Sequence, residues 1–212
     1  PTNSAKCRSS VLRTLPDDRF VLAAAYNHRV FVFDNRDLRE IVCLNHHKAA
    51  VLGLAGPNPE EEPDSPYFFS SGEDCKLYCV DRRTWGVVAE RRLAKYLLSL
   101  SYRNRQIWCG DSAGNLQLID PFSPDLSILS TLNIANKLNI RDVRQNLGAV
   151  LCASSDKKIR VYSPGLAPQL MVELGPFDSE PTRLHYAHGI LACAFAHQGG
   201  EQSVGILNFH LD

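Results

Sequence analysis

The sequence repeats one pattern four times and then gives a fifth, degraded copy. In each copy a short apolar strand leads into a turn of small or polar residues, and a second strand follows that ends on a polar residue. The copies read RFVLAAAYNHRVFVFDNR, YFFSSGEDCKLYCVDRR, RQIWCGDSAGNLQLID, GAVLCASSDKKIRVYSP and GILACAFAHQGGEQSVGILNF. Their second strands end at Asp34, Asp81, Asp120, Ser163 and near Asn208, so successive spacings are 47, 39, 43 and 45 residues.

This period predicts a β-propeller, since a repeat of about 40–45 residues with four strands is the signature of a propeller blade. The apolar runs are short and nearly continuous, which is typical of strands buried on both faces. Stretches such as REIVCL and LSILSTL supply outer strands, and SSVLRTL and LLSLSYR supply inner ones. The weak helical pattern over residues 89–100 is interpreted as two strands that flank a loop at Lys95 and Tyr96.

We therefore expect an all-β chain of about five four-stranded blades. A single propeller domain is predicted over residues 1–212, with repeats at about 1–45, 46–92, 93–132, 133–176 and 177–212. The last repeat stops before a fourth strand, and the N-terminal PTNSAKC is a short candidate to complete it. The proline-rich, acidic insert GPNPEEEPDSP is expected to form an extended loop.

Composition narrows the possible partners and chemistry. The formal net charge is zero, which argues against a general nucleic-acid or anionic-membrane binder. No apolar run approaches the roughly 20 residues of a membrane span, and the N-terminus lacks the apolar core of a signal peptide. Seven cysteines without zinc spacing predict small buried residues in a reducing compartment, so we expect a cytoplasmic or nuclear protein without a metal site.

A few polar positions within the repeat match the pattern of WD-repeat propellers, in which an Asp, a His, a Ser or Thr and a Trp tie down the turn between the second and third strands. Asp74 and Asp156 each precede the end of the third strand by seven residues, and Asn27 has the same offset from Asp34. His47 is the candidate histidine, and Ser70 and Ser154 are the candidate hydroxyls. The Trp is replaced throughout, at Phe33, Val80, Ile119, Tyr162 and near Leu207, so the relay is expected to be incomplete.

The stretches SGED…VDRR, YLLSLSY, WCGDSAGNL and LGAVLCASSDKKIRVYSP resemble the later repeats of F-box/WD-repeat proteins. The resemblance implies a non-catalytic, protein-binding propeller that holds the substrate of a Skp–cullin–F-box ubiquitin ligase. In that family an F-box docks on a Skp-type adaptor and thereby on the cullin. No F-box stands in this sequence, so the resemblance implies the last five blades of a ring of about seven.

The face with these turns and the loops between blades is the usual partner site of a propeller. Nine residues are predicted to bind a partner there, and their Lys, Arg, His and Tyr side chains suit carboxylates or phosphates. They are Tyr26, His28, His47, Lys48, Lys95, Tyr96, Arg141, Lys157 and Lys158. Asn27, Asp74 and Asp156 are predicted to fix the turns.

Two other function classes stay open, namely a WD-repeat scaffold of another multiprotein complex and a propeller hydrolase. The sequence contains no GxSxG, P-loop, HExxH or Rossmann fingerprint. We therefore predict neither catalytic residues nor a cofactor, and protein substrates as the partners.

Overall fold

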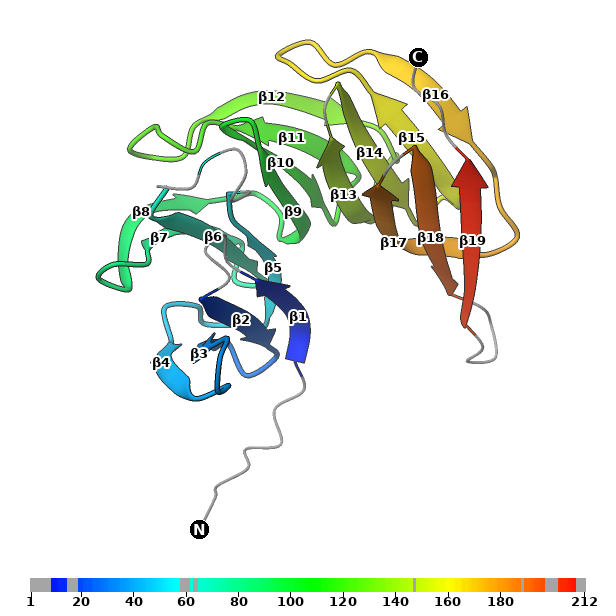
Figure 1. Cartoon of the computed structure of the whole chain (residues 1–212). Coiled ribbons are helices and arrows are strands. Elements are labelled where there is room, and N and C mark those ends of the chain that lie inside the picture. The colour runs from blue at the N-terminus through cyan, green and yellow to red at the C-terminus, as the bar shows by residue number, and fades with distance from the viewer. Residues whose placement is uncertain are drawn as a thin grey trace. The chain divides into compact units, whose positions relative to one another are not determined.

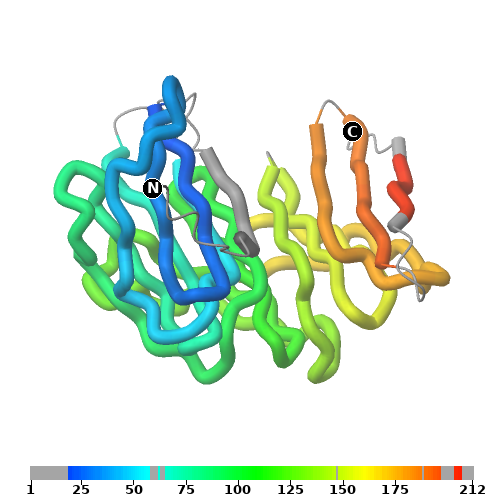
Figure 2. The backbone as a smooth tube through the Cα atoms, turned by 90° about the horizontal axis from the view of Figure 1, so that it is seen from below, coloured from blue at the N-terminus to red at the C-terminus, as the bar shows by residue number. Residues whose placement is uncertain are grey.

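The computed structural model describes residues 9–14, 19–57, 62, 65–146, 148–187, 189–196 and 202–208. Within these ranges the chain forms β-strands and turns and no helix (Figure 1). The strands make four four-stranded sheets and a last sheet of three strands, each in simple consecutive order. All neighbouring strands pair antiparallel, as the hairpins of Figure 2 show. The predicted all-β propeller architecture is thereby confirmed.

The described chain divides into two compact units, each of which is considered by itself. Unit 1 comprises residues 1–97 and 124–126, and unit 2 comprises residues 98–123 and 127–212. Unit 1 holds the first two sheets. The first sheet contains β1 (Ser9–Thr14), β2 (Phe20–Ala25), β3 (Val30–Asp34) and β4 (Glu40–Leu44). The second contains β5 (Val51–Ala55), β6 (Tyr67–Gly72), β7 (Lys76–Asp81) and β8 (Gly86–Arg92).

Unit 2 holds the other three sheets. The third sheet contains β9 (Leu97–Arg103), β10 (Gln106–Asp111), β11 (Asn115–Ile119) and β12 (Ile128–Asn133). The fourth contains β13 (Ile140–Asn146), β14 (Ala149–Ser154), β15 (Lys158–Tyr162) and β16 (Leu170–Leu174). The fifth contains β17 (Glu180–Ala187), β18 (Ile190–Ala196) and β19 (Gln202–Asn208). The pattern over residues 89–100 is indeed two strands, β8 and β9, with a loop between them.

In the second, third and fourth sheets the second and third strands form the cores, as their continuous apolar runs predicted. In the fifth sheet Val204 and Ile206 of β19 are 68% and 69% exposed. Every residue of β14 is buried, and β6, β7, β10 and β11 are buried except at their first residue. In unit 1 one cluster joins β2 and β3 to β5, β6 and β7 through residues such as Leu22, Val51 and Phe68. In unit 2 two clusters join consecutive sheets in the same way. The sheets therefore pack face to face within each unit.

In the first four sheets, a polar residue at the end of the third strand or directly after it caps the following turn. Asp34, Asp81 and Asp120 each accept the backbone N–H two residues later, over 2.9, 2.8 and 2.9 Å. Ser163 accepts the N–H of Gln169 over 2.9 Å. A short acid bonding its own backbone two residues on is the Asx-turn arrangement, which explains why the repeat places a polar residue there.

The last sheet shows three strands among the described residues, as the sequence predicted. The N-terminal PTNSAKC, the candidate for a fourth strand, lies outside them, as does most of the acidic insert at residues 56–66. The number of blades in a complete ring and the single-domain assignment stay predictions.

Candidate protein-interaction surface

The turn between the second and third strands and the segment that enters the first strand lie at the same end of each sheet, because consecutive strands alternate in direction. We call this end the turn face. In unit 1 it comprises the β2–β3 and β6–β7 turns and the β4–β5 and β8–β9 segments. In unit 2 it comprises the β10–β11 and β14–β15 turns and the β12–β13 segment.

In unit 1, most of the predicted contact residues are exposed on the turn face. Tyr26 is 57% exposed, and His28 beside it has a left-handed backbone with φ of 61°. Lys48 and Lys95 are exposed and Tyr96 is half-buried. The side chains of Lys48, Lys95 and Tyr96 make no hydrogen bond to another described residue of the chain, so they are available to a partner.

The structure corrects the prediction that His47 contacts a partner, because the His47 side chain does not lie on the surface. It is 2% exposed and fully hydrogen-bonded within the sheet. A partner cannot touch it without unfolding the turn, so His47 is a structural residue.

In unit 2, two of the three cationic residues predicted to contact a partner form ion pairs with acids of the same chain. Arg141 pairs with Glu180, and Lys158 pairs with Glu173, each over 2.5 Å. Lys157 is exposed and donates only to the backbone oxygen of Asp178, over 2.9 Å. Of these three, Lys157 is the side chain most open to a partner.

The predicted relay forms around Ser70 in the second sheet. His47 Nδ1 lies 3.1 Å from both Asp74 carboxylate oxygens, and His47 Nε2 lies 2.9 Å from Ser70 Oγ. Asp74 also accepts the backbone N–H groups of Lys48 over 2.9 Å and of Lys76 over 3.2 Å. The carboxylate therefore joins the β4–β5 segment to the β6–β7 turn.

Tyr78 packs beside this group of hydrogen-bonded side chains. The sequence had led us to expect an incomplete relay, because the tryptophan is replaced. The residue at the Trp position is Val80, but Tyr78 lies opposite Ser70 on the neighbouring strand. Its hydroxyl donates to the His46 backbone oxygen over 3.2 Å, and its ring meets both His46 and His47 edge-on at 4.7 Å. Tyr78 therefore supports the two histidines by ring packing and by a backbone hydrogen bond.

His46 adds a second imidazole to the same hydroxyl. Its Nε2 lies 3.0 Å from Ser70 Oγ. Burial, together with the nearby His47, lowers the pKa of His46 to about 4, although Asp74 opposes the shift. Burial also lowers the pKa of His47 against the opposing effect of Asp74. Both rings are neutral at pH 7. His47 then donates from Nδ1 to Asp74 and accepts the Ser70 hydroxyl, while His46 donates to Ser70 Oγ.

The Ser70, His47 and Asp74 side chains have the connectivity of a catalytic triad, but the surroundings point to a structural role. Ser70 is 0% exposed and is shared between two imidazoles, so its oxygen has no path to a substrate. A nucleophile needs an open approach and donors for the oxyanion that forms beside it. The arrangement instead stabilises the turn that carries Glu73 and Asp74.

The fourth sheet uses an arginine for the same purpose. Asp156 accepts the Ser154 hydroxyl and the Lys158 N–H, and it pairs with Arg160 Nη2 over 2.6 Å. Arg160 also donates to Ser154 over 3.1 Å and to Glu173 over 2.8 Å. Burial alone would raise the pKa of Asp156, but Arg160 and Ser154 outweigh it and lower the pKa. The turn role predicted for Asp156 and Ser154 is present, with Arg160 in place of the histidine.

The third and first sheets depart from the pattern in different ways. In the third, Asp111 at the end of β10 accepts the N–H groups of Ala113 and Asn115, both over 2.8 Å. In the first, the predicted turn residue Asn27 is exposed and its side chain makes no hydrogen bond to another described residue. That turn is closed by the hydrogen bond from Ala25 N–H to the Arg29 backbone oxygen, over 3.0 Å. The structure therefore corrects the prediction that the Asn27 side chain fixes the turn.

Sequence reasoning missed a clamp between the first strands of unit 2. Asp142 on β13 is 1% exposed and accepts the Ser99 hydroxyl from β9 over 2.9 Å and the Leu184 N–H from β17 over 2.8 Å. Arg144 donates to the same carboxylate over 3.1 Å. An acid within the apolar pattern IRDVR was the available signal, because a buried carboxylate requires partners.

The comparisons with known proteins agree with this geometry. No protein-family model matches the chain. F-box/WD repeat-containing protein 9 of Homo sapiens is 30% identical over 169 residues, which cover 77% of this chain and 34% of that protein. The Bos taurus protein of the same name is 29% identical over 150 residues, covering 70% of this chain and 31% of the relative. The chain thus spans about a third of the length of these relatives.

Solved structures show the fold independently. A chain of the mitotic checkpoint complex matches with a TM-score of 0.75 at 12% identity, over 88% of this chain and 58% of that one. The designed Ika8 protein matches with a TM-score of 0.71 at 18% identity, over 92% and 57%. The chain has a β-propeller fold. Its repeats are related in sequence to those of an F-box/WD-repeat protein, as the quoted motifs indicated.

Two further findings concern the described part of this propeller chain. Its described residues form no helix long and apolar enough to cross a membrane. Its described histidines, cysteines and acids form no group of three that could hold a metal ion.

Proposed function

We propose that this WD-repeat chain is the substrate-recognition part of an F-box protein in a Skp–cullin–F-box ubiquitin ligase. The observation that carries the proposal is the sequence similarity to F-box/WD repeat-containing protein 9, over 70% and 77% of this chain in two species. In this proposal a Skp-type adaptor and the cullin are reached through an F-box of the parent protein. The propeller holds the substrate and performs no catalysis.

The turn face of unit 1 is the proposed contact surface for the substrate. Tyr26, Lys48, Lys95 and Tyr96 supply an aromatic and cationic set. Tyrosines are enriched in protein interfaces, and the two lysines suit an acidic partner. The β4–β5 segment that carries Lys48 is anchored by hydrogen bonds at Ser70 and Asp74. A rigid support of this kind lowers the entropy that is lost when a partner binds.

We also propose a cytoplasmic or nuclear location for the protein. The free thiols of the six described cysteines suit a reducing compartment. Fluorescence microscopy of the tagged parent protein tests this location.

Co-purification from cells tests the proposed function. The parent protein carrying Lys48→Glu and Tyr96→Ala is expected to lose its substrates and to keep the Skp-type adaptor, because the two changes lie on the turn face and not in an F-box. The control pairs Arg36→Glu with Phe122→Ala, which reverses one charge and removes one exposed ring in turns at the opposite ends of their sheets.

Two outcomes would contradict the proposal. One is a parent protein that captures no Skp-type adaptor, which would favour a WD-repeat scaffold of another complex. The other is substrate capture that the double variant leaves unchanged, which would move the contact away from the turn face.

A further inference from the structure

The first strands of unit 2 carry an unequal distribution of charge. Four arginines lie on β9, β13 and β17, and the same three strands contain two acids, Asp142 and Glu180. The whole chain has a formal net charge of zero, and β5 in unit 1 contains no charged residue. The excess of positive charge is therefore local to this surface. We call the four arginines the basic track; they are Arg103, Arg141, Arg144 and Arg183.

Hydrogen bonds between the strands fix the order of these arginines. Arg183 Nη1 donates to the backbone oxygen of Arg141 over 3.3 Å, which sets these two at one level near the turn face. Arg103 Nη1 donates to Asn146 Oδ1 over 2.7 Å, which sets Arg103 at the other end of β13. Arg144 lies between the two levels. With a strand rise of about 3.3 Å per residue, the five steps from Arg141 to Asn146 span roughly 17 Å.

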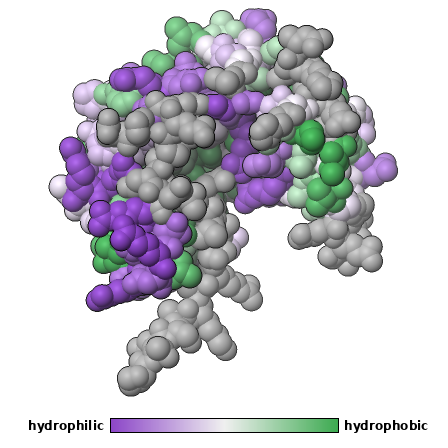
Figure 3. Space-filling view, in the orientation of Figure 1, coloured by the Kyte–Doolittle hydropathy of each residue, from purple (hydrophilic) through white to green (hydrophobic). Residues whose placement is uncertain are grey.

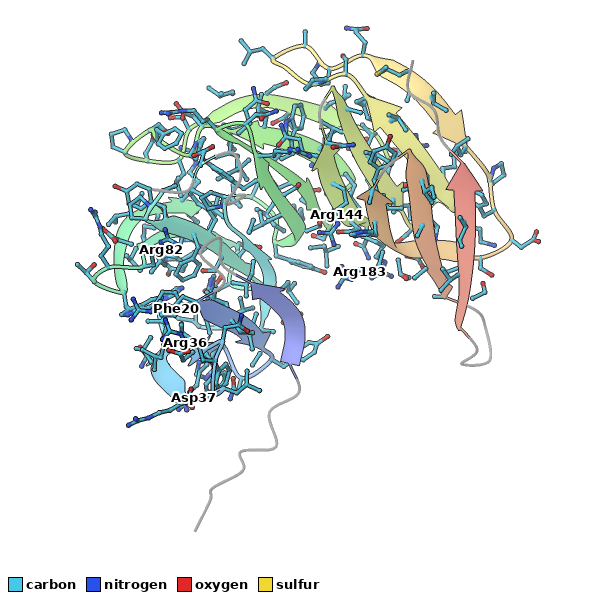
Figure 4. All side chains as sticks on the ribbon, in the orientation of Figure 1. Phe20, Arg36, Asp37, Arg82, Arg144 and Arg183 are labelled. Atoms are coloured by element: carbon cyan, nitrogen blue, oxygen red, sulfur yellow. The ribbon has the colours of Figure 1, made fainter. Side chains whose placement is uncertain are left out.

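Two members of the track keep donors available. Arg144 uses Nε for Asp142, and its two terminal amino groups make no hydrogen bond to another described residue. Arg183 is exposed and uses one terminal amino group, for a backbone oxygen. Figure 4 shows both side chains extending to the same side from β13 and β17, and Figure 3 shows hydrophilic residues over that region. The surface is charged and has unfilled donor capacity.

Arg141, in contrast, has a carboxylate partner for its guanidinium group. It is bound by the Glu180 carboxylate, which the Ser155 hydroxyl also contacts. The single buried acid of the three strands, Asp142, is saturated by Ser99, Leu184 and Arg144. It does not neutralise the outward-facing ends of Arg144 and Arg183. Arg183 therefore lacks the carboxylate that Arg141 has. Arg144 has Asp142 at its Nε, and its two terminal amino groups make no hydrogen bond to another described residue.

We infer that the basic track binds an extended acidic peptide segment of a partner protein, through aspartate and glutamate carboxylates aligned with the first strands of unit 2. Alternate side chains of an extended peptide lie about 7 Å apart, so two or three acids match the roughly 17 Å of the track. The arginines of the basic track lie at different heights along the strands. This arrangement suits several separate carboxylates better than one doubly charged group at a single position. The inference rests on the proposed protein-binding function and adds the chemistry of the bound segment.

Fluorescence anisotropy with the purified chain tests the inference. The probe is a dye-labelled ten-residue peptide with Glu and Ser at alternate positions, and its counterpart has Gln in place of Glu. The Glu peptide is expected to bind, with an affinity that falls as salt is added. Arg144→Gln together with Arg183→Gln is expected to weaken its binding about 10-fold or more, since charged hydrogen bonds are lost.

A charge-matched control separates the track from net charge. Arg36→Gln with Arg39→Gln removes the same two charges from the exposed β3–β4 turn of unit 1 and should leave the affinity unchanged. Arg144→Gln could disturb the Asp142 clamp, so Arg183→Glu alone serves as the second variant. Arg183 is exposed, and its reversal should weaken peptide binding while the circular dichroism spectrum and melting temperature stay the same.

Four results would overturn the inference. The first is a Gln peptide that binds as well as the Glu peptide, and the second is full affinity in both track variants. The third is binding of a peptide with one phosphoserine where the Glu peptide does not bind, and the fourth is equally tight binding of a single-stranded oligonucleotide. Failure here is distinguishable from failure of the proposed function. Lys48→Glu with Tyr96→Ala lies in unit 1 and tests substrate capture, whereas the peptide experiment tests unit 2 alone.

Discussion

At the scale of single residues, the structure depends on a few buried polar groups that satisfy one another completely. Asp142 is the clearest example, because one carboxylate joins β9, β13 and β17. Buried donors and acceptors cost about 1–3 kcal/mol when one partner is removed, and more when a charge is involved. Such residues should therefore dominate the response of the chain to mutation.

Asp142→Ala is predicted to lower the free energy of unfolding by about 3 kcal/mol or more, since it leaves the Ser99 hydroxyl and the Leu184 N–H unsatisfied. Urea denaturation followed by circular dichroism measures the change. Asp178→Ala is the matched control: the residue is exposed, and the change should stay within about 0.5 kcal/mol. Equal effects of the two substitutions would show that the clamp is not formed in solution.

The histidine pair predicts a pH dependence of stability. His46 has a pKa of about 4 when folded and the ordinary value of 6.5 when unfolded, so the unfolded chain binds more protons between these values. The stabilising contribution is complete above pH 6.5 and is lost as the pH falls toward 4. His47 adds to the same trend. Asp74, Lys76 and Tyr78 are the other titratable groups packed around the pair.

Urea midpoints at pH 7, 5.5 and 4.5 measure this loss. His46→Gln removes one titrating ring and should reduce the fall in midpoint between pH 7 and 4.5. His185→Gln changes an exposed histidine on β17 and should leave the fall unchanged. A wild-type midpoint that is flat over this range would contradict the buried, neutral state of His46.

At the scale of strands and turns, one position of the repeat performs one task with different chemistry. The residue three before the end of the third strand is Tyr78, Gln117 or Arg160 in successive sheets. Tyr78 packs on the two histidines, Gln117 reaches Asp111, and Arg160 pairs with Asp156. Each stabilises the turn between the second and third strands. The turn is thus the common requirement, and the side chains that meet it vary.

Asp156→Ala is predicted to destabilise the chain more than Lys157→Ala does. The aspartate holds Ser154, Lys158 and Arg160, and its loss should cost about 1–3 kcal/mol. Lys157 is exposed and its loss should cost about 0.5 kcal/mol or less. Arg160→Met provides an independent check, because it should approach the effect of Asp156→Ala. Equal melting temperatures for the Asp156 and Lys157 variants would rule out this assignment of the turn.

The sequence predicted the elements better than the contacts between them. Apolar runs and the polar residue at a strand end depend on local chemistry. The sequence therefore sufficed to predict the strands and to place Asp34 and Asp81 at the ends of their strands. The roles of Asp142 and Arg160 depend on which strands become neighbours, and no local pattern contains that information. Asn27 has the same offset from the end of its strand as Asp74 and Asp156, yet its exposed side chain makes no hydrogen bond to another described residue.

At the scale of the whole molecule, the buried cysteines report on the core of each unit separately. Cys79 lies in unit 1, and Cys109, Cys152 and Cys193 lie in unit 2; all four are buried. Cys43 and Cys75 are only partly buried. The difference in burial divides the described thiols into a protected set and an accessible set.

Brief alkylation of the native protein at pH 8, followed by peptide mass spectrometry, is predicted to modify Cys43 and Cys75 and to spare Cys79, Cys109, Cys152 and Cys193. Burial raises the pKa of Cys79 and of Cys193 to about 12, and it raises the pKa of Cys109 and of Cys152 as well. A thiol with a pKa of about 12 is ionised in roughly one molecule in ten thousand at pH 8. The thiolate is the reactive form, and the packed strands also exclude the reagent. All six described thiols should react in urea. Native labelling of Cys109 or Cys152 as fast as that of Cys75 would contradict the buried second strands on which both units are built.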